Sequence, residues 1–406
     1  MVAKTFCLSS FFELFRWSRV KLNYKEILDL KFWKYMKSIL FVLDYFTPHR
    51  WWVENVFENI IQRLDKKWYK IFILTSRFDK SLPGCEQNWN VKIYRVWSSR
   101  ISFMMRAIKI GKKVLEENKI DIIHASTYWW AIPAAILAKK FDKKVILTVH
   151  EIFGKLWYKY KWVAKWFLYK VFETIIFKFK YDIYHCVSHN TENELIAEYN
   201  VDKKKICVIH NWVDYDFWDP NKVEDYEIKS LRARQNWWDK FVFLYFGHAG
   251  KSKWIDYLVE ALPELSKLEN VEIVLNIIDS KRTRKTISKI KKIKWNNIKL
   301  FNGMAKDDLR VLVASCDSVI APSISEWFGS VHTEACAMWK ILITSKTSAI
   351  PEVVSWKVRF IKPGSSKEII EAAKDVIEWK YKKIPIKTFD WDKNVGNIER
   401  LYESFK

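Results

Sequence analysis

The chain has 406 residues, half of them hydrophobic, and its 70 Lys and Arg against 47 Asp and Glu give a formal charge of +23. This length predicts two domains or more, and the hydrophobic content excludes a wholly disordered protein. Because no stretch of about 18 uncharged apolar residues occurs, we expect no membrane-spanning helix. The six cysteines are scattered without a C-x-x-C pair, which argues against a structural zinc site and fits a reducing compartment.

Residues 1–35 are basic and aromatic, and their apolar stretches are too short and too interrupted by charge for a secretory signal. Met36 directly precedes the first strand pattern, at 38–46. Two interpretations stay open. The segment is an artefact of a wrongly assigned start, or it is a real extension that lies on a membrane surface.

Short apolar runs then alternate with amphipathic helical patterns. The expected strands of a first series are 38–46, 70–75, 91–96, 120–124, 144–148, 183–188 and 206–209, with helices between them, for instance at 54–67, 104–118 and 191–199. A polar stretch without periodicity follows, and the expected strands of a second series are 241–246, 271–278, 298–301, 317–321 and 341–344. Such alternation predicts mostly parallel sheets with helices on both faces.

The sequence therefore predicts an α/β protein with two Rossmann-like domains. We place an N-terminal extension at 1–35, the first domain at 36–215, a linker at 216–240, the second domain at 241–387 and a C-terminal helix at 388–406. We expect this last helix to return to the first domain.

One basic helix of the first domain is a candidate membrane contact. Residues 155–180 contain seven Lys, ten aromatic residues and a single Glu. A helix of this composition can lie on an anionic membrane surface. The alternative is a helix that packs on the sheet with its lysines in water.

The proportion of tryptophan to glycine is abnormal. The chain has 23 Trp and 9 Gly, whereas glycine alone usually makes up roughly 7% of a protein, about 28 residues at this length. Several tryptophans stand in turn sequences that require a positive φ or a close backbone approach, among them Trp51, Trp52, Trp89 and Trp212.

We therefore hypothesise that the gene uses a variant code in which UGA specifies glycine, and that the printed sequence translates UGA as Trp. The alternative is an unusually Trp-rich protein. UGG codons at Trp51, Trp52, Trp212 and Trp339 would support that alternative.

The sequence richest in candidate chemistry is 322–335, which reads PSISEWFGSVHTEA and leads from an apolar strand into a helix. In a doubly wound sheet, ligands bind at the loops beyond the carboxyl ends of the strands. The N-terminus of the helix that follows offers free N–H groups for an anion such as phosphate. Glu326 and Glu334, eight residues apart, are able to hold separate hydroxyl groups of one ligand.

This stretch resembles the E-x7-E signature of the retaining nucleotide-sugar glycosyltransferases of family 4, which have the GT-B fold. Other motifs resemble those of the family in the same order: TPHRWWVE after the first strand, NWVD before the linker, GHAGKSKW after the first strand of the second domain, then IPEV and FDW. The resemblance covers roughly residues 37–406. At several motif positions, including 52, 212, 327 and 339, this chain has Trp where the family has Gly.

The resemblance implies three catalytic residues. Glu326 would hold the hydroxyls of the donor sugar, and Lys253 would neutralise the diphosphate and stabilise the leaving group. His150, at the end of an expected strand, would face the sugar across the cleft; a structural role is the alternative for this histidine. Glu334 would hold the ribose hydroxyls of the nucleotide.

The resemblance also implies donor-binding positions that act mainly through their backbone, namely Phe328, Gly329, Ser330, Val331, Gly247, Trp51, Trp52 and Met304, and one that would act through its side chain, His248. Position 52, as glycine, would let the backbone approach the diphosphate. His248 replaces the usual Arg of the family, and a neutral imidazole is a weaker phosphate partner. No Asp-x-Asp motif follows a strand, so we expect no metal and no cofactor.

The implied function is a retaining transfer of a sugar from a nucleoside-diphosphate donor to a glycan or lipid-linked acceptor, in envelope polysaccharide or glycolipid synthesis. The expected location is the cytoplasm, with an anionic membrane surface at the inner face of the plasma membrane as a partner. A non-catalytic GT-B protein that binds a sugar nucleotide or a membrane is the alternative. Nucleic-acid binding is disfavoured because the charge is spread and no recognition module is present. A dehydrogenase is disfavoured by the missing G-x-G-x-x-G.

Overall fold

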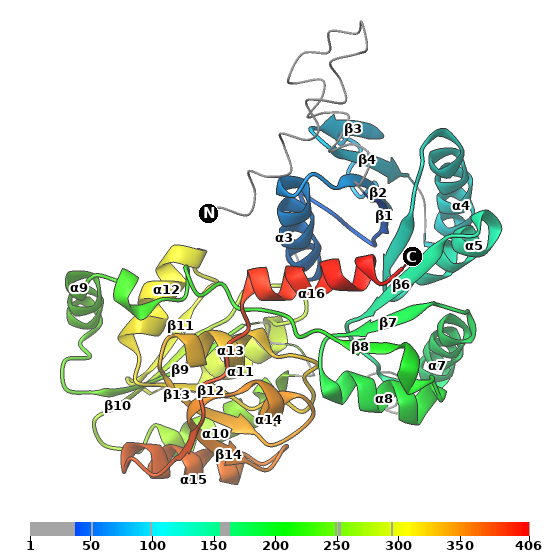
Figure 1. The fold of residues 1–406 in the computed structure, drawn as a ribbon. Helices are drawn as coiled ribbons and strands as arrows, with labels where there is room; N and C mark the ends of the chain where they lie inside the picture. Colours follow the sequence, from blue (N-terminus) through cyan, green and yellow to red (C-terminus); the bar gives the residue numbers. More distant parts are fainter. Residues whose placement is uncertain are drawn as a thin grey trace, which may run out of the picture.

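The computed structural model describes residues 37–49, 52–97, 100–154, 163–247, 250, 253–293 and 295–405. These residues form two α/β lobes, each built on its own sheet (Figure 1). The segment 1–35, for which two interpretations stay open, lies outside the described residues.

The sheet of the first lobe has eight strands in the order β3-β4-β2-β1-β5-β6-β7-β8. They are β1 (Ser38–Val42), β2 (Lys70–Ser76), β3 (Cys85–Asn88), β4 (Val91–Val96), β5 (Ile122–Ser126), β6 (Lys144–Val149), β7 (Ile183–Cys186) and β8 (Ile206–Val208). Only the β3–β4 pair is antiparallel. The helices are α3 (Trp52–Lys66), α4 (Arg100–Glu117), α5 (Ala131–Phe141), α7 (Val163–Lys178) and α8 (His189–Tyr199).

The sheet of the second lobe has seven strands in the order β11-β10-β9-β12-β13-β14-β15. They are β9 (Phe241–Phe246), β10 (Val271–Asn276), β11 (Ile298–Phe301), β12 (Ser318–Ala321), β13 (Ile341–Ser345), β14 (Trp356–Ile361) and the antiparallel β15 (Lys382–Ile384). The helices are α9 (Asp225–Gln235), α10 (Ile255–Leu265), α11 (Arg284–Lys292), α12 (Lys306–Ser315), α13 (Ser330–Ala337), α14 (Ile350–Val353), α15 (Ser366–Ile377) and α16 (Trp391–Glu403). The fold class expected from the sequence, two Rossmann-like domains with mostly parallel sheets, is confirmed.

In both sheets the strand order reverses beside the first strand. β1 pairs with β2 on one side and with β5 on the other, and β9 lies in the same way between β10 and β12. The connections on the two sides of such a strand run over opposite faces of the sheet, so the loops at its carboxyl end diverge and leave a crevice. In the second lobe this crevice lies between the loops that follow β9 and β12.

The last helix, α16, lies against the first lobe, although the strands that precede it belong to the second (Figure 1). Four of its apolar side chains are buried in one cluster with α3 and β1. The hydroxyl of Tyr402 lies 2.7 Å from Nδ1 of His124, and Nζ of Lys37 donates to the carbonyl of Tyr402. This helix therefore connects the second lobe to the first through buried apolar and hydrogen-bonding contacts.

One helix forms where the sequence shows no periodicity. α9 lies within the segment 216–240 that we expected as a linker, and its Arg232 donates to the carbonyl of Ser315 at the end of α12, 2.7 Å away. Leu231 is the one residue of this helix that is fully buried. A charged helix with so small an apolar face gives no periodic signal.

No helix within the described ranges is long and apolar enough to cross a membrane. The basic segment 155–180 is described only in its second part, as α7. This helix leaves four large apolar side chains exposed to solvent: Phe167, Leu168, Val171 and Ile175.

Three helices are followed, two residues after their last residue, by a tryptophan with a left-handed backbone conformation. Trp68, Trp339 and Trp379 follow α3, α13 and α15 and have φ of 66°, 55° and 60°. In each case the next N–H reaches back to the last turn, as Lys340 does to the carbonyl of Ala335, 3.0 Å away. This is the Schellman arrangement, in which glycine is the usual residue because a side chain strains the backbone.

Three more tryptophans, Trp89, Trp254 and Trp356, have φ of 53°, 44° and 70°. Within the described part of the chain, eleven non-glycine residues have positive φ, and these six tryptophans are the majority. Four of the other five are Asn or Asp, the types that tolerate this conformation, whereas a bulky side chain is an outlier there. The recoding hypothesis predicts this distribution, and it stays a prediction.

The backbone strain predicts that glycine stabilises the chain at two exposed positions. We expect Trp68→Gly and Trp379→Gly each to raise the free energy of unfolding by about 1 kcal/mol, because glycine removes the cost of the left-handed conformation. Both indoles are about 60% exposed and contribute little packing. Urea denaturation of the recombinant chain measures the change.

Trp237→Gly is the matched control. Trp237 is 0% exposed, and losing a buried indole should lower the free energy of unfolding by about 3–5 kcal/mol. Loss of stability at positions 68 and 379 as well would contradict the argument. In the native protein, the recoding hypothesis predicts glycine at 68, 339 and 379 in the masses of tryptic peptides.

Candidate active site

The loops that follow β9 and β12 bring together a lysine and a glutamate. Nζ of Lys253 forms an ion pair with Oε1 of Glu326. The same oxygen accepts a hydrogen bond from the Ser323 hydroxyl, 2.6 Å away. Glu326 is only 6% exposed, and a charge pair shielded from water interacts more strongly than one at the surface. Two of the three expected catalytic residues therefore lie in direct contact.

The charge state of this pair follows from its surroundings. Burial by itself would raise the pKa of Glu326, but Lys253, His332 and the two side-chain hydrogen bonds outweigh it, so the pKa lies below its usual value. Burial lowers the pKa of His332 to about 4. At neutral pH the site thus holds an ionised carboxylate beside a neutral imidazole. Neither His332 nor Ser323 was predicted from the sequence as a site residue.

Two glycines let the first turn of α13 approach this pair. Gly329 has a φ of 81°, and a Cβ there would lie 2.7 Å from Nδ1 of His332. Gly247 has a φ of 116°, and a Cβ there would lie 2.9 Å from Cγ2 of Val331. Gly247, which directly follows β9, therefore lies against the first turn of α13, whose first N–H groups have no partner within the helix. Such an N-terminus binds anions.

The structure describes two of the other expected donor-binding residues, Phe328 and Met304, with their contacts. Phe328 is buried against Phe389, with ring centroids 5.3 Å apart, so its side chain anchors the loop and only its backbone can serve a ligand. The N–H of Met304 donates to Oδ1 of Asn276, 3.1 Å away. Trp51, His248 and the side chain of Trp52 lie outside the described residues.

Glu334 lines a cavity of about 460 Å³ between the two lobes. Asn55 and Asn59 of α3 belong to its walls, together with Asn211 and Lys306. This volume lies within the range of small-molecule sites. Burial raises the pKa of Glu334 to about 7, against the opposing effects of Lys306 and Lys253.

Two indoles crowd one wall of this cavity. The rings of Trp212 and Trp391 have centroids 3.3 Å apart, closer than the 4.5–7 Å at which aromatic pairs pack. The Arg63 guanidinium carbon lies 4.4 Å from the Trp391 ring centroid. Glycine at 212, as in the family motif, would remove the crowding and enlarge the cavity.

His150 directly follows β6 and is almost fully buried. Its ring lies edge-on to Phe57 of α3, with centroids 5.7 Å apart. Burial, and then the neighbouring His185, lower the pKa of His150 to about 3. The imidazole is therefore neutral, and it lies on the first lobe, whereas Lys253 and Glu326 lie on the second.

Trp327 spans the space between the His150 loop and the Glu326 loop. Its Nε1 donates to the carbonyl of Ile152, 3.4 Å away, and its ring centroid lies 4.8 Å from that of Phe153. Trp327 follows Glu326 directly in the chain, and its indole fills the space between these two loops. A glycine there would leave the space open.

One buried carboxylate organises the loop that follows His150, and it was not predicted as a site residue from the sequence. Glu173 of α7 is buried and accepts hydrogen bonds from the N–H groups of Phe153 and Gly154, at 2.9 and 2.8 Å, and from the Tyr128 hydroxyl, at 3.0 Å. It fixes the loop that follows His150. Its isolation as the single acid of a basic helix was the only available hint.

Family models match both lobes of the chain. Residues 53–217 match the model of Glycosyltransferase Family 4, and residues 227–387 match the model of Glycosyl transferases group 1. An uncharacterized glycosyltransferase of Methanocaldococcus jannaschii is 24% identical over 85% of this chain and 92% of its own. The phosphatidylinositol N-acetylglucosaminyltransferase GPI3 subunit of Saccharomyces cerevisiae is 20% identical over 90% of this chain and 80% of its own.

Solved structures share the two-lobed fold. Sucrose-phosphate synthase from Thermosynechococcus elongatus superposes with a TM-score of 0.73 at 14% identity, covering 91% of this chain and 98% of that one. Anabaena HepE, solved in complex with UDP-glucose, superposes with a TM-score of 0.70 at 17% identity, covering 90% and 99%. Since the two family matches follow one another over most of the chain and the fold is GT-B, the chain belongs to the family 4 glycosyltransferases.

Proposed function

We propose that the chain is a retaining glycosyltransferase that moves a sugar from a nucleoside-diphosphate donor to a hydroxyl acceptor. The observation that carries the proposal is the shielded ion pair of Lys253 and Glu326 beside the first turn of α13. An ionised carboxylate accepts hydrogen bonds from sugar hydroxyls, whereas an ammonium and free helix N–H groups suit a diphosphate. HepE, which shares the fold, was solved with UDP-glucose.

The proposed mechanism divides the donor among these groups. Lys253 and the N-terminus of α13 bind the diphosphate and stabilise the charge that develops on it as the sugar–phosphate bond breaks. Glu326 orients the sugar, His150 contacts the sugar from the first lobe, and Glu334 accepts hydrogen bonds from the ribose. The leaving phosphate takes the proton of the acceptor hydroxyl, which attacks from the same face and keeps the anomeric configuration.

For the acceptor we propose a lipid-linked molecule or glycan. Two observations support this choice: the relative in yeast is named a phosphatidylinositol N-acetylglucosaminyltransferase subunit, and α7 exposes four large apolar side chains. An apolar face on a lysine-containing helix suits an anionic membrane surface. We accordingly propose that the enzyme acts in glycolipid or polysaccharide synthesis in the cytoplasm, at the inner face of the plasma membrane.

One observation favours a second function. The Trp327 indole fills the space between the Glu326 loop and the loop that follows His150. With a true tryptophan there, the protein would be a non-catalytic GT-B protein that binds a sugar nucleotide or a membrane. With glycine there, the space next to the ion pair is free for a donor sugar.

The position of the Trp327 indole predicts that Trp327→Gly activates the recombinant chain. We expect kcat/KM for hydrolysis of UDP-glucose or UDP-N-acetylglucosamine to rise at least about tenfold, equivalent to about 1.4 kcal/mol. Release of UDP measures the rate. Trp238→Gly, which removes a solvent-exposed indole, is the control and should change nothing. Equal rates for the Trp327→Gly and unmodified chains would show that the indole does not block the cleft.

The ion pair predicts a large loss of turnover when either partner is replaced. In the Trp327→Gly background, we expect Lys253→Ala and Glu326→Gln each to lower kcat at least about 100-fold, because each removes a charged group at the reacting centre. Lys267→Ala breaks the exposed pair of Lys267 and Glu264 and serves as the control. A Glu326→Gln chain that turns over at the unmodified rate would refute the site.

The raised pKa of Glu334 predicts how donor binding depends on pH. Only the ionised carboxylate accepts both ribose hydroxyls, so a donor favours deprotonation, and affinity should rise with pH until it levels off above about 7. Calorimetric titration with UDP-glucose, whose diphosphate does not titrate between pH 6 and 8, measures this. Glu334→Gln should bind more weakly, with affinity independent of pH over this range. An unchanged pH profile in that variant would assign the effect to another group.

A further inference from the structure

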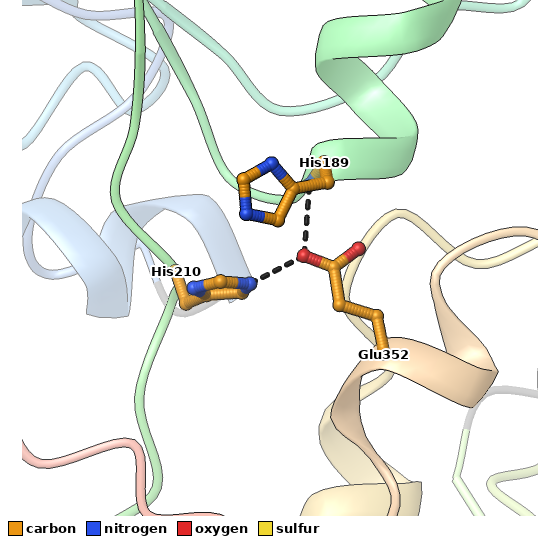
Figure 2. Close-up of side chains that lie close together, drawn as sticks. All are labelled: His189, His210 and Glu352. Carbon is orange, nitrogen blue, oxygen red and sulfur yellow. Dashed lines mark hydrogen bonds and ion pairs between the residues drawn. The ribbon is translucent and has the colours of Figure 1, made fainter.

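A second polar cluster lies at the junction of the two lobes, outside the proposed donor site (Figure 2). His189 begins α8, His210 follows β8, and Glu352 belongs to α14 of the second lobe. One ligand atom from each of these residues lies within 4.8 Å of the others. His210 and Glu352 are 142 residues apart in sequence, so no spacing motif could indicate the cluster.

The Glu352 carboxylate is directed at both histidines. Its Oε1 accepts a hydrogen bond from the backbone N–H of His189, at 2.8 Å, and lies 2.5 Å from Nε2 of His210. Its Oε2 accepts a hydrogen bond from the N–H of Asn190, at 3.3 Å. A carboxylate of the second lobe thus caps a helix of the first lobe and contacts the His210 imidazole.

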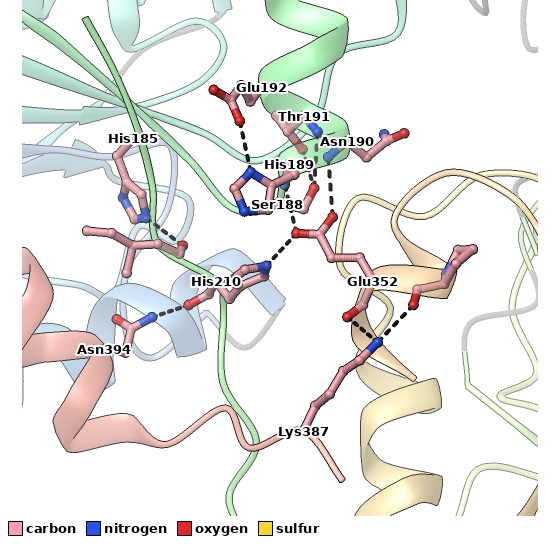
Figure 3. A network of polar contacts seen from close by, with 12 residues as sticks. His185, Ser188, His189, Asn190, Thr191, Glu192, His210, Glu352, Lys387 and Asn394 are labelled. Atoms are coloured by element: carbon pink, nitrogen blue, oxygen red, sulfur yellow. Dashed lines mark hydrogen bonds and ion pairs between the residues drawn. The ribbon is translucent and has the colours of Figure 1, made fainter. Parts of the chain in front are cut away.

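Neighbouring groups hold each of the three residues in place (Figure 3). Nδ1 of His189 lies 2.9 Å from Oε2 of Glu192, which leaves Nε2 as the free ring nitrogen. The carbonyl of His210 accepts from Nδ2 of Asn394, and that of Glu352 accepts from Nζ of Lys387, 2.8 Å away. A carboxylate on the second nitrogen of a histidine is the usual support of zinc-binding imidazoles.

We propose that His189, His210 and Glu352 bind a Zn²⁺ ion at the junction of the lobes, with water as the fourth ligand. Two imidazole nitrogens and one carboxylate oxygen form a ligand set that Zn²⁺ prefers. The ion would replace the hydrogen bond between Nε2 of His210 and Oε1 of Glu352. The His189 side chain is 62% exposed, so the ion can enter from solvent and a water molecule can reach the open position.

Two lysines lie near the cluster, and each is engaged by other groups. Nζ of Lys203 lies 3.9 Å from Oε1 of Glu192. Nζ of Lys387 donates to two backbone carbonyls, those of Pro351 and Glu352. Both ammonium groups are therefore engaged by atoms other than the three proposed zinc ligands.

The site also connects to the catalytic loop. Just before α14, the N–H of Ala349 donates to the carbonyl of Glu326, 3.1 Å away. An ion on Glu352 would thus stabilise the present arrangement of the lobes and of the Glu326 loop. The zinc site does not depend on the proposed sugar transfer, because its ligands are separate from the donor site.

Calorimetric titration of the metal-free full-length chain with Zn²⁺ tests the proposal. We expect one Zn²⁺ per chain, and no comparable binding of Mg²⁺, which prefers oxygen ligands. His189→Ala, His210→Ala and Glu352→Gln should each abolish this binding or weaken it more than tenfold. Glu192→Gln, which removes only the support of His189, should weaken it about 10–100-fold.

His49→Ala is the matched control, since Nδ1 of His49 also pairs with a carboxylate, that of Glu54, at 3.2 Å. It should bind Zn²⁺ as the unmodified chain does. Co²⁺ provides a second readout, because its visible absorption reports imidazole ligation. The absorption should change in the His189→Ala variant. Since the His189 side chain is exposed, this substitution should leave the fold intact. Failure of the unmodified chain to bind Zn²⁺ would overturn the proposal. The proposal would also be overturned if the His189→Ala and Glu352→Gln variants bound Zn²⁺ as tightly as the unmodified chain does.

Discussion

The reversal of strand order beside β9 is the constraint on which the donor site depends. Because the connections from β9 and β12 leave over opposite faces of the sheet, their loops diverge, and the crevice between them receives Lys253 and Glu326. Each charge in this shielded crevice needs the other, since a lone buried charge is costly. The N-terminus of α13 lies close to this pair only because Gly247 and Gly329 leave room for it.

Among the described residues, contacts of different chemistry join the lobes. α16 buries apolar side chains against the first lobe, Glu352 caps α8 across the junction, and the Trp327 indole contacts Ile152 and Phe153 of the first lobe. The contacts of α16 and of Glu352 connect the two lobes, whereas the Trp327 indole fills part of the space between them. The recoding hypothesis, which stays a prediction, would account both for the tryptophans with positive φ and for the indole at position 327.

Much of the fold could be predicted from the sequence, because buried parallel strands read as continuous apolar runs. The bounds expected for 91–96, 241–246 and 298–301 agree with β4, β9 and β11. The short antiparallel β3 and β15 and the charged α9 were missed, since none of them has a clear apolar pattern. Motif resemblance singled out Glu326 and Lys253, but it could not show their contact. The roles of Glu173 and of the cluster at Glu352 depend on partners distant in sequence, which only the folded chain brings together.

A crystal structure of the chain with UDP-glucose, determined with Trp and with Gly at position 327, would locate the donor. We expect the diphosphate at the N-terminus of α13 beside Lys253, the ribose on Glu334, and the glucose next to Glu326 once the indole is removed. A nucleotide bound elsewhere, or no nucleotide in either chain, would contradict the assignment of this crevice as the donor site.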